Sequence, residues 1–181
     1  MKRHLFFILA FISIVFTACN LTGSADSTPD IVPLRTAVTQ HKDSLYMSLT
    51  DTSRVYRLDT VHVGDTVTFI MGFTGNLNNL VSVRITNSVP DSVAQVLLSG
   101  TTNQLDSIFL PTSNYAKGVF YLRAKSVSLI FPFKYVAKKP TKAARLSFFV
   151  QSDANFKDGL GDNSNTLALR IPIVAKKDTV K

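Results

Sequence analysis

The sequence predicts an all-β protein: an antiparallel β-sandwich of about nine strands that follows a signal peptide and a flexible tether. Apolar residues alternate with polar ones over several short segments, and this is the period of half-buried strands. Val, Thr, Ser and Phe are frequent while Glu and Trp are absent, which favours strands and turns over helices. In a chain of 181 residues, we expect residues 34–181 to form one domain.

The N-terminal segment has the parts of a signal peptide for export. A basic start at residues 2–4 precedes an apolar run over residues 5–16 and a small pair at residues 17–18. The run is too short to cross a bilayer, which needs roughly 20 helical residues. Residues 1–18 are therefore predicted to be removed just before Cys19, the single cysteine of the chain.

The segment Phe16-Thr17-Ala18-Cys19 resembles the lipobox of Gram-negative lipoproteins, with Phe16 where that motif usually has an aliphatic residue. The resemblance implies that the Cys19 thiol receives a diacylglycerol, and acyl chains gain about 0.8 kcal/mol per buried methylene in a membrane. Asn20 rather than Asp follows the cysteine, which in such lipoproteins implies the outer membrane. The periplasmic or cell-surface side stays open. Ordinary secretion with cleavage near Ala18 is the alternative.

Residues 19–33 are rich in Ser, Thr, Asp, Gly and Pro and poor in apolar side chains. This composition is typical of a flexible tether. A flexible segment of this length reaches roughly 20 Å. The tether would let the domain stand clear of lipid headgroups.

Strands are predicted from the period-2 pattern. The strong segments are residues 66–73, 81–85, 127–135 and 167–174, and the weaker ones are 45–49, 55–63, 105–110, 119–122 and 146–150. Pro132 and Pro172 lack the N–H of a ladder, which predicts an edge or a bulge at each. Gly64-Asp65 predicts a tight hairpin turn. Residues 90–98 have helical spacing after a proline and are the exception, a predicted helix.

The stretch Val61-His62-Val63-Gly64-Asp65-Thr66-Val67-Thr68-Phe69 resembles the early strands of bacterial immunoglobulin-like domains. In those domains a Val-Gly-Asp turn precedes an alternating Val-x-Phe strand. The resemblance covers a short span and implies an immunoglobulin-like sandwich. The Cys and Trp marks of antibody domains are absent.

A polar loop over residues 153–163 is the candidate metal site. Its oxygen ligands would be Asp153, Asn155, Asp158 and Asp162, and Ca²⁺ takes 6–8 oxygens. The spacing departs from an EF-hand loop, because the Asp-Gly pair comes one residue late and no Glu closes the loop. Asp, Asn and Gly are also the ordinary residues of a long hairpin loop. No other cofactor is predicted.

The residue inventory argues against an enzyme, because the mature chain offers only His41 and His62 and no Glu. No nucleic-acid recognition motif is present, and export would separate the protein from nucleic acid. Lysines and an arginine over residues 134–145, with three lysines over residues 176–181, could face anionic lipid or polysaccharide, but protection of sheet edges explains them as well. Tyr115 is the candidate aromatic platform for a sugar, and the other tyrosines would fill the core or its rim.

The sequence therefore predicts a lipid-anchored, non-catalytic binding or structural component of the cell envelope. Its partner would be an envelope protein or a surface glycan, contacted through the loop of residues 153–163. The alternative is a Ca²⁺-dependent carbohydrate-binding or carbohydrate-active surface protein that uses the same loop.

Overall fold

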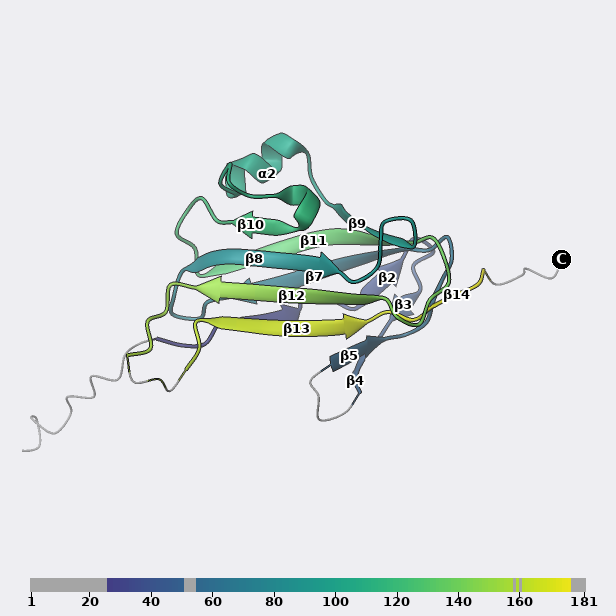
Figure 1. Cartoon of the computed structure of the whole chain (residues 1–181), viewed down its shortest axis with the longest axis horizontal. Helices are drawn as coiled ribbons and strands as arrows, with labels where there is room; N and C mark the ends of the chain where they lie inside the picture. The colour runs from purple at the N-terminus through teal and green to yellow at the C-terminus, as the bar shows by residue number, and fades with distance from the viewer. Residues whose placement is uncertain (1–25, 51–54, 158, 160, 177–181) are drawn as a thin grey trace, which may run out of the picture.

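The computed structural model describes residues 26–50, 55–157, 159 and 161–176. Within these residues the strands form two six-stranded sheets and one short two-stranded pair (Figure 1). The two large sheets pack face to face, with the rings of Phe133 and Phe148 5.9 Å apart across the interface. The predicted β-sandwich is confirmed. None of the described helices is long and apolar enough to span a membrane.

Sheet A is organised around its two longest strands, β7 and β11. Its strands are β1 (Asp30–Pro33), β2 (Ala37–Thr39), β3 (Ser44–Leu45), β7 (Thr66–Thr74), β9 (Ala94–Leu98) and β11 (Ser128–Ala137). Their order is β3-β2-β7-β11-β9, with β1 also paired to β7. Alternate residues of β7 and β11 are buried, and Phe69 stacks on Phe133 with ring centroids 5.1 Å apart. The period-2 pattern of the sequence thus faces the core.

Sheet B covers the other side of this core. Its strands are β4 (Met47–Leu49), β5 (Val55–Leu58), β8 (Leu80–Asn87), β10 (Val119–Tyr121), β12 (Arg145–Ser152) and β13 (Ser164–Arg170), and the small pair is β6 (Val61–His62) with β14 (Ile173–Val174). The order in sheet B is β10-β8-β12-β13-β5-β4. Two pairings, β13–β5 and β14–β6, are parallel and were not expected. Parallel neighbours need a long connection, and nearly the whole domain lies between these strands.

The two prolines occupy positions where a missing N–H is tolerated. β9 pairs with β11 only from Phe133 onward, so Pro132 has a neighbouring strand on one side. Ile70 lies opposite Pro132, and its carbonyl accepts a hydrogen bond from Leu34 on the far side of β7. The proline nitrogen therefore faces the open edge of β11, as predicted. Pro172 lies between β13 and β14 and separates them.

Two segments have the opposite secondary structure to that predicted. The predicted helix over residues 90–98 is a turn followed by β9, which pairs with β11. The predicted strand over residues 105–110 is largely helix α2 (Thr102–Ile108). Thr101 and Gln104 form a capping box at its start, and Leu105 is its buried residue. Cap hydrogen bonds and pairing with a distant strand outweighed the local apolar spacing.

Three predicted boundaries also moved. The Gly64-Asp65 turn is present, with Gly64 at φ 94°, but it joins strands of different sheets, because β6 pairs with β14. The strand predicted over residues 45–49 divides at Tyr46, so that β3 belongs to sheet A and β4 to sheet B. Residues 30–33, expected in the tether, form β1 against β7 with Ile31 buried in the core. Residues 1–25, including the predicted signal peptide and Cys19, lie outside the described part of the chain.

Candidate functional site

The first described residues are fastened to the loops at one end of the sandwich. The Asn76 amide donates to the Thr28 carbonyl at 2.9 Å, and the Asn165 amide donates to the Pro29 carbonyl at 3.0 Å. The Asp162 N–H donates to the Thr28 hydroxyl at 3.3 Å. We call this the proximal end, formed by residues 26–29, 75–79 and the described part of 153–163.

The predicted metal loop therefore lies at the proximal end, and its first ligand is already engaged. The two carboxylate oxygens of Asp153 accept hydrogen bonds from Asn79, one from the backbone N–H at 2.7 Å and one from the side-chain amide at 2.9 Å. The bond from the Asn79 side chain is the main cause that lowers the pKa of Asp153. Asn155 and Asp162 are exposed, and Asp158 lies outside the described residues.

Within the described residues, no three His, Cys, Asp or Glu side chains gather closely enough to hold a metal ion. The hydrogen bonds of Asp153 give this carboxylate a structural role, because it ties the β12–β13 loop to the β7–β8 loop.

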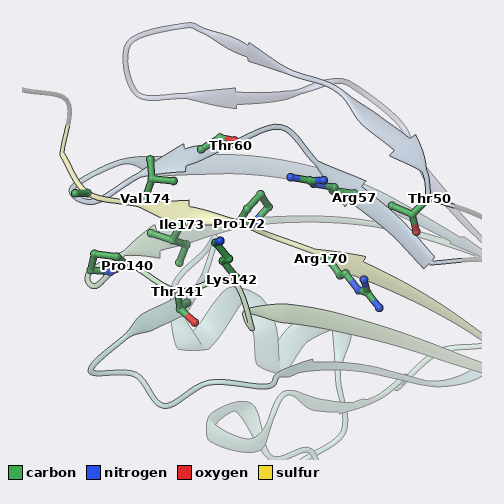
Figure 2. Close-up of a pocket in the computed structure, with 11 residues that line it drawn as sticks. Thr50, Arg57, Thr60, Pro140, Thr141, Lys142, Arg170, Pro172, Ile173 and Val174 are labelled. Atoms are coloured by element: carbon green, nitrogen blue, oxygen red, sulfur yellow. The ribbon is translucent and has the colours of Figure 1, made fainter.

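A groove lies at the opposite, distal end of the molecule. Its volume is about 880 Å³, and it lies between β5, the end of β13, β14 and residues 140–142 (Figure 2). Among the described residues that line it, Arg57, Lys142 and Arg170 are charged and none is acidic. Three threonines bring hydroxyl groups to its wall, and apolar surface comes from Pro140, Pro172, Ile173, Val174 and Ala175.

Two of these cations belong to a row of three arginines on the outer face of sheet B. Arg170 is the register partner of Arg145 on β12 and also of Arg57 on β5. All three side chains are exposed. We call Arg145, Arg170 and Arg57 the arginine row.

The row has no acidic neighbours within its own sheet. The strands of sheet B contain no aspartate, and their charged residues are Arg84 and the three arginines of the row. Arg84 is placed over the ring of Phe149, 5.4 Å from its centroid. Among the described residues, the contact found within 4 Å between a basic side chain and a carboxylate joins His62 Nδ1 and Asp65 at 3.7 Å. Like charges directly opposite each other on neighbouring strands are destabilising, so the row is not explained by folding.

The basic residues predicted from sequence separate into different surfaces. Lys134 is exposed on sheet A, and the Lys138 ammonium donates to the Gln95 side chain at 2.8 Å. Lys142 lines the groove. Lys177 and Lys181 lie outside the described residues. Sequence reasoning missed Arg57 and Arg170 because only strand register brings them together.

A second hollow, of about 640 Å³, includes Tyr115, the predicted sugar platform. Asn87, Asp91, Gln95 and Lys117 also line it. The ring of Tyr115 packs on Phe120 with centroids 5.9 Å apart. Its hydroxyl donates to Asp106 at 2.6 Å, and desolvation and this bond raise the pKa of Tyr115 to about 12. The packing on Phe120 and the hydrogen bond to Asp106 hold the ring of Tyr115 in place and give it a structural role.

The other tyrosines differ from expectation in part. Tyr135 is fully buried in the core as predicted. Tyr46, however, is 67% exposed, because it lies at the point where the chain passes from sheet A to sheet B. Tyr121 is 38% exposed on β10, at the edge of sheet B.

The chain matches no family model and no curated protein. One similar solved structure is a DUF4466 family protein from Parabacteroides merdae, with a TM-score of 0.39 and 11% identity over 81% of this chain and 45% of that one. Another is the seventh PapD-like domain of human CEP192, with a TM-score of 0.37 and 7% identity over 87% of this chain and 93% of that one. The present chain thus spans about half the length of the first. Both TM-scores are below 0.5, and the fold of this chain is defined by its own strand pairing.

Proposed function

We propose that this protein is a lipid-anchored, non-catalytic component of the Gram-negative cell envelope. Acylated Cys19 attaches it to the outer membrane, and the distal end of the sandwich binds a ligand or partner. The observation that carries the proposal is that the two ends of the domain differ. Residues 26–29 are fastened to the proximal loops, and the large groove opens at the other end.

The short distance between the anchor and the domain supports this orientation. Residues 26–29 bond to the proximal loops and residues 30–33 form β1, so the segment left between Cys19 and the fastened part of the chain is much shorter than the tether predicted from sequence. Six residues separate Cys19 from Asp26, and a chain of that length reaches at most roughly 25 Å even when fully extended. An acylated Cys19 would therefore keep the proximal end close to the lipid headgroups.

The same reasoning changes the expected contact face. The loop of residues 153–163 was the predicted partner site, but Asp162 and Asn165 bond to residues 28 and 29. Under an anchor at Cys19 this loop faces the membrane. The distal groove is the better candidate for contact with another molecule, since it is concave and faces away from the anchor.

Metabolic labelling with a fatty acid tests the anchor. We expect the wild-type chain to carry the label and to fractionate with the outer membrane, and Cys19→Ala to lose both properties. Asn20→Asp is the matched control, because it should keep the label while moving the protein to the inner membrane. A Cys19→Ala variant that stays labelled and membrane-bound would overturn the proposal.

Crosslinking in intact cells, followed by mass spectrometry, tests the contact face. Lys142 at the groove should yield crosslinks to a partner, whereas Lys157 in the proximal loop should not. Partner crosslinks confined to Lys157 would restore the loop of residues 153–163 as the contact surface.

A further inference from the structure

We propose that the arginine row and the adjoining groove form a binding site for an acidic polysaccharide, held through its carboxylate groups. The inference rests on the proposed function for the direction in which the site faces. The site itself is defined by residues of the described structure.

The spacing of the row suits an extended ligand. Neighbouring strands of a sheet lie about 4.8 Å apart, so the three arginines start from points that span about 10 Å across sheet B. Figure 2 shows Arg57 and Arg170 on different strands beside the groove, with their guanidinium groups pointing in different directions, and Lys142 near the same groove. A linear chain that crosses the strands would therefore meet several cations in succession.

The type of cation favours oxyanions. A guanidinium group presents a planar fork of donors that matches a carboxylate with two parallel hydrogen bonds. Bound carboxylates would also neutralise the repulsion between Arg145, Arg170 and Arg57, which have no acidic partner among the described residues. The energetic conflict within the free protein would thus be relieved in the complex.

The neutral part of the groove favours a sugar over a bare ion. Thr50, Thr60 and Thr141 bring hydroxyl groups to the wall, where they can exchange hydrogen bonds with sugar hydroxyls. Pro140, Pro172 and Ile173 bring apolar surface for the C–H faces of a pyranose ring. A small anion such as phosphate would use the cations but leave most of the groove empty.

The position of the site separates a glycan from the protein's own membrane. Anionic headgroups could also bind arginines. Residues 28 and 29 are bound to the proximal loops, however, so an anchor at Cys19 would hold that end toward the membrane, and the groove lies at the other end. We therefore favour a soluble or surface-attached polysaccharide as the ligand.

Calorimetry with the full chain in neutral detergent tests the site, with polygalacturonate as the probe and uncharged dextran as the control ligand. The test variant is Arg57→Gln with Arg170→Gln. Its matched control, Arg35→Gln with Lys134→Gln, removes the same charge from exposed positions on the sheet A side. Thermal melting of each variant confirms that it is folded.

We expect the wild-type chain to bind polygalacturonate and not dextran. The double variant in the row should bind at least tenfold more weakly, because charge-assisted hydrogen bonds are lost, and the control variant should stay within threefold of wild type. Arg57→Lys with Arg170→Lys keeps the charge but not the fork. Its affinity for polygalacturonate should therefore lie between that of the wild-type chain and that of the Gln double variant in the row.

Equal weakening of both Gln variants would overturn the proposal, since it would show binding by net charge alone. Absence of polygalacturonate binding would also overturn it, whether or not inorganic phosphate or phosphatidylglycerol vesicles bind in its place. This binding assay does not depend on acylation. A failed binding assay beside intact fatty-acid labelling would refute the ligand and leave the anchor, and the reverse result would refute the anchor alone.

Discussion

The hydroxyl of Tyr135 provides a sharp test of the structure, because it is buried and has no hydrogen-bond partner among the described residues. An unsatisfied buried hydroxyl costs about 1–3 kcal/mol. Tyr135→Phe keeps the ring that packs in the core and removes only the oxygen. We therefore expect the free energy of unfolding at pH 7 to rise by about 1–2 kcal/mol, and the melting temperature to rise by roughly 2–8 °C.

The same substitution should change the alkaline limb of the stability curve. Burial raises the pKa of Tyr135 from 10.0 to about 12, so the folded state keeps the proton that the unfolded state loses in this range. Ionisation of Tyr135 therefore does not affect the free energy of unfolding below pH 10. As the pH rises from 10 to 12, it lowers the free energy of unfolding by up to about 1.4 kcal/mol per pH unit. Tyr135→Phe removes this ionisation, so its free energy of unfolding should fall less steeply over that range.

Urea denaturation at several pH values measures both effects, and Tyr121→Phe is the control because that side chain is 38% exposed. The control should change stability by less than about 0.5 kcal/mol. A loss of more than about 1 kcal/mol in Tyr135→Phe at pH 7 would refute the reasoning, since it would show that the hydroxyl makes a favourable hydrogen bond.

Three further results are expected. Gly118→Ala should lower the free energy of unfolding, measured by urea denaturation, by about 3 kcal/mol or more, because the added methyl would meet the Ile85 carbonyl oxygen. Gly159 has nearly the same φ as Gly118 (69° against 64°) but lies in open space, so Gly159→Ala should lower it by about 1–2 kcal/mol. Equal losses in the two variants would contradict this reasoning. Arg170→Gln should raise the free energy of unfolding by about 0.2–1 kcal/mol at low salt, less at high salt, and a destabilised variant would refute the repulsion. Millimolar Ca²⁺ should leave the melting temperature unchanged, and a rise that Asp153→Ala abolishes would support a metal site in the loop.

The long strands could be predicted from the sequence because their burial is regular. β7, β8, β11 and β12 alternate buried residues with half-buried or exposed ones over most of their length, and this alternation is visible as apolar and polar letters. β9 could not be predicted in this way. Its five residues are mostly half-buried, and it is a strand because β11 offers it a partner.

Helix α2 did carry a readable signal. Thr101 followed by Gln104 is a capping-box pair, and the cap bonds are present in the structure. The apolar residues Leu105 and Ile108 suggested a strand, but Ile108 is 44% exposed. The cap was the better guide than the apolar content, because a short helix on the surface needs little burial.

The candidate site was harder to predict than the fold. The pairing of Arg145 with Arg170 follows from one hairpin, and correct loop bounds would have revealed it. Arg57 joins the row through a parallel pairing between strands near opposite ends of the domain. That register depends on the packing of the whole sheet, so no local pattern in a single sequence encodes it.

The distribution of the two basic residue types strengthens the case for a specific site. The formal net charge of +8 would by itself fit a general role in solubility. Within the described strands, however, lysine occurs only at Lys134 on sheet A, while sheet B carries Arg84 and the arginine row. Solubility is served equally by lysine, and the described lysines other than Lys134 lie outside the strands. A concentration of the forked cation on one sheet face, without acidic residues in its strands, is what recognition of carboxylates requires.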